Sequence, residues 1–497
     1  MTRIDSREVM PGDTFVAVRG AARDGAAYVE AAIAAGAARV VSEDPPPTAL
    51  PPGVEWVRVA DSRAAAAHLA CEDAGRPSEN GLAVVAVTGT NGKTTVANLA
   101  RRILSATGSP CALWSTIESD PNPPENAAPS PARNTTPGPV ELQGFFSEAL
   151  RRGCRAAAIE ASSHALDQKR IDGTRLACAI FTNFTQDHLD YHRTMEAYGA
   201  AKARLFLDLK PRAAVVNSDD PFGATLAAKT RAAGTPTLTY GFSDGADLRI
   251  GDLRLDPDGS EFSIVFSEIA RDRLRKLGSA PCAPRLNVRT RLMGRHNALN
   301  AAAALGAALS LGTPPERAAE ILADAPPVRG RLEPVRVPGR ENAAFFVDYA
   351  HTPDALANVL RTLRELVRAP GRLTVVFGAG GDRDRTKRPL MAKACAANAD
   401  ALIVTSDNPR SEDPEAIIGD VLSGLSPRDM ERAVAIADRR QAIRRAVEMA
   451  DRPGDVVIVA GKGHEDYQIF ADRTVHFDDR EELLACSSLA SSPRQPS

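Results

Sequence analysis

Short, unbroken runs of apolar residues recur along the chain and alternate with stretches of helical periodicity. The middle of the chain has such runs at 84–87, 156–159, 178–181 and 213–216, and the last third has them at 345–347, 373–377, 401–404 and 456–459. Continuous apolar runs of this length are typical of strands that are buried on both faces of a parallel sheet. Strands that alternate with helices therefore predict an α/β fold with helices on both faces of parallel sheets.

Length and proline clusters divide this pattern into three segments. The chain has 497 residues, which favours about three domains at ~150 residues each. A stretch rich in Gly and Pro at 75–81 and the pair Pro326-Pro327 separate the segments. We therefore expect domains at 1–80, 81–328 and 329–497, the first with short strands at 14–18, 40–41 and 56–59 and Ala-rich helices.

The segment from Val84 to Thr95 carries the most specific chemistry. An apolar strand leads directly into Gly89-Thr90-Asn91-Gly92-Lys93-Thr94-Thr95, and a helical pattern follows. Backbone N–H groups in such a turn bind phosphate oxygens, and the helix N-terminus adds positive potential. Lys93 would reach the terminal phosphates and the Thr94 hydroxyl would bind a magnesium ion. The loop is one of the shortened kind, because Val87 stands where the usual pattern has its first glycine.

Polar residues follow several of the other predicted strands. Glu160, Asp348, Asp407 and Gly461 each come at or just after the end of an apolar run. The carboxyl ends of parallel strands share one edge of a sheet, where ligands bind. Glu160 would therefore stand across from the phosphate loop, as a nucleotide-bound magnesium ion requires; the alternative is a solvated carboxylate at a strand end.

Two groups of polar residues suggest substrates. Hydroxyl, amide and guanidinium groups of the first suit a polar, acidic substrate: Asn134, Thr135, Thr136, Ser162, Gln168 and Arg170. Arg383, Arg410 and Glu465 lie in loops after strands of the third segment. Two guanidinium groups and a carboxylate match a zwitterionic ligand such as an amino acid.

Six of the eight histidines fall in polar clusters near predicted strand ends. His188 and His192 have the i, i+4 spacing of a zinc site, but no third ligand lies nearby at a suitable spacing, so zinc is disfavoured. We interpret His192 as structural. Pattern alone would make Lys202, within a predicted helix, a surface lysine.

Composition excludes several classes of function. Net charge is -2, hydrophobic content 43% and charged content 25%, which indicates an ordinary soluble globular protein. A general nucleic-acid or membrane-surface role is not favoured, while a local basic cleft stays open as an alternative. The N-terminus lacks the apolar core of a signal peptide, and the apolar stretch at 298–311 is too short to span a bilayer. Seven single cysteines without a C-x-x-C pair favour a reducing, cytoplasmic location.

The order of the motifs resembles the Mur ligase family over nearly the whole chain. Besides the phosphate loop, the resemblance includes Asp5-Ser6-Arg7, Asn134-Thr135-Thr136, Ser162-Ser163-His164, Asp187-His188, Ala201-Lys202, Gly294-Arg295-His296-Asn297, Asp348-Tyr349-Ala350-His351, Asp407-Asn408-Pro409-Arg410 and Gly461-Lys462-Gly463-His464-Glu465. It implies a three-domain architecture, with a central P-loop ATPase domain built on a parallel sheet and a Rossmann-like C-terminal domain. It also implies an ATP-dependent, Mg²⁺-requiring ligase of peptidoglycan synthesis.

Site roles follow from the resemblance, residue by residue. It places the uridine end of a UDP-N-acetylmuramoyl-dipeptide at Ile4, Ser6 and residues 21–23, and the nucleotide near Asn297, Arg331 and Asp348. It implies that Lys202 is carbamylated and binds a second metal with His188, while Thr94 and Glu160 bind the first. The resemblance also implies a site for the incoming amino acid, called the acceptor site below, which consists of Arg383, Asp407, Asn408, Pro409, Arg410, Gly461 and Glu465.

Arg410 indicates the subgroup that adds meso-diaminopimelate, because an arginine fork can bind the second carboxylate that lysine lacks. A lysine-adding member, a folylpolyglutamate synthase and a non-catalytic nucleotide-binding homologue remain alternatives. Lys93, Glu160, His188 and Lys202 favour a catalyst, and we expect a monomer without a nucleic-acid partner. Residues 114–119 deviate from the turn typical of the family and receive no predicted role.

Overall fold

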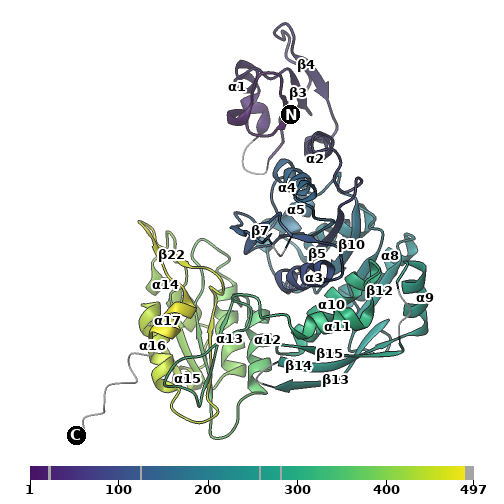
Figure 1. Ribbon diagram of the computed structural model, residues 1–497. Coiled ribbons are helices and arrows are strands. Elements are labelled where there is room, and N and C mark those ends of the chain that lie inside the picture. Colours follow the sequence, from purple (N-terminus) through teal and green to yellow (C-terminus); the bar gives the residue numbers. More distant parts are fainter. Residues whose placement is uncertain (21–23, 124–125, 257–258, 280–282, 487–497) are drawn as a thin grey trace.

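The computed structural model describes residues 1–20, 24–123, 126–256, 259–279 and 283–486. Three lobes follow one another along the chain (Figure 1). The N-terminal lobe lies at the top of the view, the central lobe below it, and the C-terminal lobe beside the central one. Each lobe is built around its own sheet.

The N-terminal lobe has a four-stranded parallel sheet in the order β1-β2-β3-β4. The strands are Thr2–Arg3, Thr14–Val16, Arg39–Ser42 and Glu55–Arg58, with α1 (Val29–Ala34) and α2 (Ser62–Asp73) beside them. Helix α2 packs on α4 (Pro139–Arg151) of the central lobe, and the Cys71 thiol donates to Gly173 O at 3.1 Å. These contacts attach the small lobe to the central one.

The central sheet has eleven strands in the order β15-β14-β13-β12-β11-β10-β5-β9-β6-β7-β8. In chain order they are β5 (Ala83–Thr88), β6 (Cys111–Trp114), β7 (Glu118–Asp120), β8 (Ser130–Pro131), β9 (Ala156–Glu160), β10 (Leu176–Phe181), β11 (Ala214–Asn217), β12 (Thr237–Gly241), β13 (Leu248–Asp256), β14 (Gly259–Phe266) and β15 (Arg285–Thr290). The pairs from β6 to β13 are parallel, as predicted. Antiparallel strands extend both edges, which the apolar runs did not indicate.

Helices cover both faces of this sheet. Val85 and Val87 of β5 pack under α3 (Lys93–Ala106), α10 (Arg295–Ser310) and α11 (Pro315–Ala323). Val84 and Ala86 point to the other face and pack with α4, α7 (Met195–Leu207) and α8 (Pro221–Ala232). The alternation of side chains along one strand thus divides the apolar run between two cores. The remaining helices are α5 (Ser163–Asp167), α6 (Leu189–His192) and α9 (Glu268–Lys276).

The C-terminal lobe has a six-stranded sheet in the order β16-β17-β21-β18-β19-β20, parallel except at β16. Its elements are β16 (Glu333–Val335), β17 (Ala344–Asp348), α12 (Pro353–Arg364), β18 (Leu373–Phe377), α13 (Lys387–Asn398), β19 (Ala401–Thr405), α14 (Pro414–Leu422), α15 (Pro427–Met430), β20 (Ala433–Ile436), α16 (Arg439–Met449), β21 (Val456–Ala460), β22 (Tyr467–Ile469), β23 (Thr474–His476) and α17 (Asp479–Ala485). Helices α12 to α14 cover one face, and α16 and α17 cover the other. The predicted α/β class, with parallel sheets covered on both faces, is confirmed.

Within the described ranges, no helix combines the length and apolar character needed to cross a membrane. The stretch expected to be a helix at 298–311 is the buried α10.

A fully buried ion pair ties the C-terminal sheet to its last helix. The Arg439 guanidinium donates to both carboxylate oxygens of Asp479 at 2.7 Å, and neither side chain is exposed. It also donates to Ala460 O at 3.0 Å, at the end of β21. Removing one partner of such a pair leaves an uncompensated buried charge.

Arg439→Leu should therefore lower the free energy of unfolding by about 3 kcal/mol or more. Arg440→Leu is the matched control, because Arg440 pairs with Glu482 at the surface and such pairs contribute about 1 kcal/mol or less. Urea unfolding followed by circular dichroism checks the difference. Equal midpoints for the two variants would contradict a structural role for the buried pair.

Candidate active site

The phosphate-loop backbone is fixed by its contact with the end of β10. Gly89 and Gly92 have φ of +145° and +86°. A Cβ on Gly89 would lie 1.8 Å from the Thr182 hydroxyl, and one on Gly92 would lie 2.4 Å from Asn300 Oδ1. Only glycine fits both the conformation and the space. The Thr182 hydroxyl donates to Asn91 O at 2.6 Å, which closes the loop onto the neighbouring strand.

Two lysines donate to one carbonyl oxygen of this loop. Lys93 Nζ lies 3.2 Å from Gly89 O and 2.9 Å from Thr90 O, and Lys202 Nζ lies 2.8 Å from Gly89 O. Burial, together with the charge of Lys93, lowers the pKa of Lys202 well below its usual value. Because Lys202 is 1% exposed, pattern-based interpretation as a surface lysine is wrong.

Glu160 lies beside the first residues of α3. Its Oε1 accepts from the Thr94 hydroxyl at 2.8 Å and from Thr116 N at 2.6 Å, and its Oε2 accepts from the Thr116 hydroxyl at 3.1 Å. Arg331, from the C-terminal side of the chain, donates to the Thr94 hydroxyl at 3.1 Å. Glu160 is 1% exposed, so the alternative of a solvated carboxylate is excluded.

The other residues predicted to bind the nucleotide differ in their contacts near Thr94 and Glu160. Thr90 and Thr95 are buried. The Asn297 amide donates to Met293 O at 2.8 Å, and its Oδ1 accepts at 3.0 Å from Asn300, the residue that lies against Gly92 of the loop. Asp348 accepts from Leu332 N at 2.6 Å and from Ala350 N at 2.7 Å, and burial raises its pKa. Asp348 therefore shapes the turn that carries Arg331.

His188 belongs to an aromatic cluster on the edge of the site. Its ring lies 4.9 Å from His164, between ring centres, and burial lowers its pKa to about 4. His192 packs 5.5 Å from His164 and 5.2 Å from Tyr198. Among the described residues, no group of three or more His, Cys, Asp or Glu side chains is arranged to hold a metal. The two ring contacts of His192 suit a structural role, while its Nε2 is buried without a hydrogen-bond partner among the described residues. The absence of zinc stays a prediction.

The residues expected to bind an acidic substrate form a connected network. The Thr136 hydroxyl donates to Glu160 O at 2.7 Å and contacts the Ser162 hydroxyl at 3.2 Å. Arg170 donates to Thr136 O at 2.8 Å and to Gln168 Oε1 at 2.7 Å.

Asn134 and Thr135 lie next to the segment that received no predicted role. Trp114 Nε1 donates to Asn134 O at 3.1 Å, and the Thr116 and Thr135 hydroxyl oxygens lie 3.1 Å apart.

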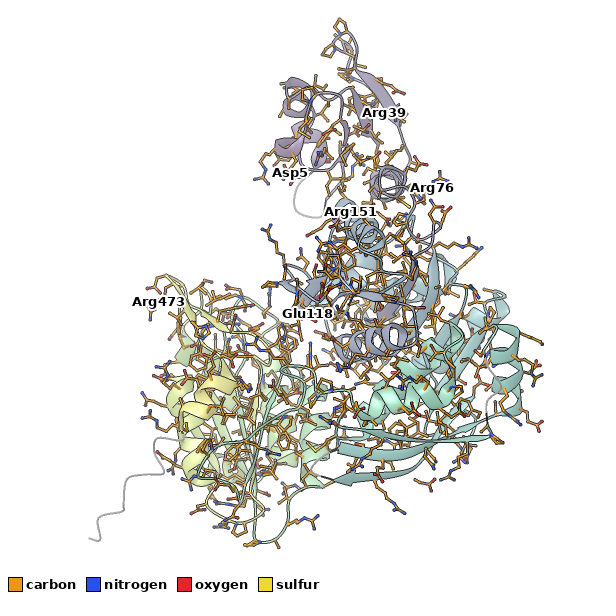
Figure 2. All side chains as sticks on the ribbon, in the orientation of Figure 1. Asp5, Arg39, Arg76, Glu118, Arg151 and Arg473 are labelled. Carbon is orange, nitrogen blue, oxygen red and sulfur yellow. The ribbon has the colours of Figure 1, made fainter. Side chains whose placement is uncertain are left out.

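Ile4 and Ser6 lie in the N-terminal lobe. Ile4 Cδ1 would be 3.7 Å from a Cβ on Gly138, at the start of α4, so this part of the lobe approaches the central one. Asp5, between them, is at the lower edge of the N-terminal lobe in Figure 2. Residues 21–23, expected to bind with them, lie outside the described residues.

The acceptor residues predicted from the third segment cluster at the ends of β19 and β21. Asn408 donates to Glu465 Oε2 at 2.8 Å, and Lys462 donates to Asn408 Oδ1 at 3.1 Å. Arg410 Nη1 donates to Gly381 O at 2.9 Å. The remaining predicted members differ in placement: Arg383 is exposed, Pro409 is buried, and Gly461 has φ of +118° with no room for a Cβ beside Asp407.

A cleft of about 790 Å³ joins the central and C-terminal lobes. Its central wall includes Asn134, Thr135 and His188, and its C-terminal wall includes Arg383, Asp407, Asn408, Arg410, Gly461 and Glu465. The wall does not include the other predicted site residues, which are the phosphate loop, Glu160, Lys202, Thr136, Ser162, Gln168, Arg170, Asn297, Arg331, Asp348, Pro409, Ile4 and Ser6. In Figure 2, Glu118 marks the side of the central lobe that faces the C-terminal one.

Three residues of the site were missed by sequence reasoning. Thr116 holds Glu160, Asn300 meets the phosphate loop at Gly92, and Lys462 is completely buried among acceptor residues. Lys462 lies within the Gly461–Glu465 motif, so the sequence does carry a signal for it. Thr116 and Asn300 have no local pattern that distinguishes them.

Comparison with known proteins agrees with this geometry. The family described as "Mur ligase middle domain" matches residues 87–308, "Mur ligase, glutamate ligase domain" matches 330–463, and "Mur ligase family, catalytic domain" matches 1–74. The UDP-N-acetylmuramoyl-L-alanyl-D-glutamate--2,6-diaminopimelate ligase of Geobacter metallireducens is 42% identical, covering 99% of this chain and 94% of the relative. The enzyme of the same name from Thermosynechococcus vestitus is 42% identical over the same shares.

Solved structures of Mur ligases also match this chain in fold. One titled as a structure of UDP-N-acetylmuramoyl-L-alanyl-D-glutamate--2,6-diaminopimelate ligase is 34% identical, with a TM-score of 0.69 over 99% of this chain and 95% of that one. MurF from Acinetobacter baumannii shares the fold at 19% identity, with a TM-score of 0.62 over 98% of this chain and 92% of that one. The lobes, the phosphate loop and the matches over nearly the full length agree, and the chain belongs to the Mur ligase family.

Proposed function

We propose that this protein is an ATP-dependent ligase that joins meso-diaminopimelate to the D-glutamate of UDP-N-acetylmuramoyl-L-alanyl-D-glutamate in peptidoglycan precursor synthesis. The observation that carries the proposal is the cleft, because one wall includes Thr116, which holds Glu160 beside Thr94, and the other presents Arg410 and Glu465. The relatives named for this reaction, at 42% identity over 99% of the chain, support it.

The reaction needs an activated carboxylate, because a free carboxylate is a poor electrophile. The γ-phosphoryl group of ATP transfers to a carboxylate oxygen of the D-glutamyl residue, and ADP leaves. The amine of the amino acid then attacks the acyl phosphate, forms the amide, and releases inorganic phosphate and a proton. Lys93, which now caps two loop carbonyls, would exchange them for phosphate oxygens and stabilise the transferring group.

The donor set at Glu160 fits Mg²⁺, which prefers oxygen ligands. Thr94 and Glu160 supply a hydroxyl and a carboxylate 2.8 Å apart in a buried corner, and the bound ion would neutralise phosphate charge. Lys202 as an ammonium cannot be a metal ligand. Its close approach to Lys93 favours the neutral amine, which reacts with CO₂ to give a carbamate and a proton. We propose that this carbamate and His188 hold a second Mg²⁺.

The rest of the substrate would extend from the cleft to the N-terminal lobe. The polar network of Thr136, Ser162, Gln168 and Arg170 would bind the dipeptide. Ile4 and Ser6 would meet the uridine end, and Asn134 and Thr135 would lie along the substrate between the two. Accordingly we assign the UDP-sugar domain to 1–80, the ATP domain to 81–328 and the amino-acid domain to 329–497. Asn297, Arg331 and Asp348 complete the nucleotide site. The protein would act as a cytoplasmic monomer, where ATP is available.

The proposal predicts phosphate release that depends on both substrates. With ATP, Mg²⁺ and the UDP-muramoyl-dipeptide, meso-diaminopimelate should give continuous phosphate release, and L-lysine should give little. A coupled phosphate assay measures both. Release only with L-lysine would identify the lysine-adding alternative, and no release with any amino acid would favour a nucleotide-binding homologue.

Arg410 should set the preference for diaminopimelate, since its fork can bind the second carboxylate. Arg410→Met should reduce kcat/KM for meso-diaminopimelate about ten- to a hundredfold, the value of a charge-assisted hydrogen bond. The activity with L-lysine should change far less. Arg473→Met is the control, because Arg473 is at the exposed tip of the same lobe in Figure 2. An equal loss with both amino acids would contradict a specificity role.

Thr116 should position Glu160. Thr116→Val removes the side-chain hydrogen bonds to Glu160 Oε2 and to Thr135 but keeps the backbone bond and the side-chain volume. Because an interaction of about 1.5 kcal/mol or more with a charged group is lost, kcat should fall about tenfold with an unchanged melting temperature. Thr107→Val, on the far end of α3, controls for loss of a hydroxyl. Unchanged kcat in Thr116→Val would show that the backbone bond alone suffices.

A further inference from the structure

Lys462 is a fully buried cation at the centre of the proposed acceptor site. Its Nζ donates to Asn408 Oδ1 at 3.1 Å, and lies 3.5 Å from Glu465 Oε2 and 3.6 Å from Asp407 Oδ1. Its side chain is 0% exposed. The ammonium therefore contacts three side chains from two loops, one after β19 and one after β21.

The charges around Lys462 are unequal. Two carboxylates, Asp407 and Glu465, face one ammonium, because the nearby Arg439 is engaged in two bonds with Asp479. Asp407 Oδ1 is buried and has no hydrogen-bond partner among the described residues. Both carboxylates line the cleft. Lys462, Asp407 and Glu465, called the Lys462 cluster below, thus carry one net negative charge. They also leave one hydrogen-bond acceptor unused, which suits an additional ammonium group.

We propose that Lys462 is a positioning residue for the amino-acid acceptor: it holds Asn408 and Glu465 in place and balances one of the two carboxylate charges, so that the pair receives an ammonium group of the amino acid. This inference rests on the proposed function and adds to it a residue that is not itself exposed to the substrate. Lys462 acts through Asn408 and Glu465, and it touches no part of the phosphate loop in the described contacts.

The Lys462 cluster also gives a pH signature. Burial and the neighbouring Asp407 raise the pKa of Glu465, while Lys462 and the hydrogen bond from Asn408 lower it. The other ionisable groups that face Glu465 are Arg439, Tyr349 and Tyr467, which keep one charge state near neutral pH. Removal of the Lys462 ammonium raises the pKa of Glu465 further. The carboxylate then ionises only at higher pH, so that binding of an ammonium group should recover as pH rises.

The test compares steady-state kinetics of the full-length wild type with Lys462→Met, with Lys462→Arg, which keeps the charge, and with Lys393→Met, an exposed lysine on α13. Lys462→Met should raise KM for meso-diaminopimelate about tenfold or more at pH 7. KM for ATP and for the UDP-muramoyl-dipeptide should change less than about twofold. The increase should shrink toward pH 9, and Lys462→Arg should restore part of the affinity. Lys393→Met should match the wild type.

A double-mutant cycle covers the case in which a buried unpaired charge prevents folding. Lys462→Met combined with Glu465→Gln removes one charge of each sign, so the double variant keeps the net charge of the buried site. On the Glu465→Gln background, Lys462→Met should raise KM less than about threefold, because the two residues act as one unit. Equal effects on both backgrounds, or an unchanged KM in Lys462→Met, would overturn the proposal. A wild type that is inactive with every amino acid would instead overturn the proposed function, and this proposal with it.

Discussion

The close approach of the phosphate loop to β10 is the constraint on which the site depends. Gly89 has no room for a side chain beside Thr182, and its carbonyl oxygen is the common acceptor of Lys93 and Lys202. Two ammonium groups on one acceptor repel each other in a buried place, so the loop geometry itself favours a neutral Lys202. The same turn starts α3 at Lys93 and thereby sets Thr94 against Glu160.

Two parallel sheets turn this local geometry into a reaction site. The chemistry of each sheet lies at the carboxyl ends of its strands, and the cleft is the place where the two sets of ends meet. Arg331 crosses between them to the Thr94 hydroxyl. Positioning of this kind contributes much of the rate in reactions that join two substrates. On the acceptor side, Lys462 distributes its charge between two loops, which explains how two carboxylates can share a small volume.

Features of the fold and the site that have a local sequence pattern could be predicted. The apolar run of β5 followed by Gly92-Lys93-Thr94 predicted strand, loop and helix, and the parallel core with Glu160 beside the loop followed from strand ends. Contacts between residues that are distant in sequence could not be predicted. The hydrogen bonds of Thr116 to Glu160 span 44 residues, and no periodicity encodes them. The antiparallel extension β13–β15 was also missed, since its β15 alternates exposed and buried residues instead of forming an apolar run.

The central claim is that this site activates a carboxylate by phosphoryl transfer. The direct measurement uses the UDP-muramoyl-dipeptide with ¹⁸O at both oxygens of the accepting D-glutamyl carboxylate, together with ATP and meso-diaminopimelate. An acyl phosphate passes one carboxylate oxygen to phosphate when the amine attacks, so mass spectrometry should find one ¹⁸O in the phosphate for each amide formed. Amide formation with unlabelled phosphate would contradict the account.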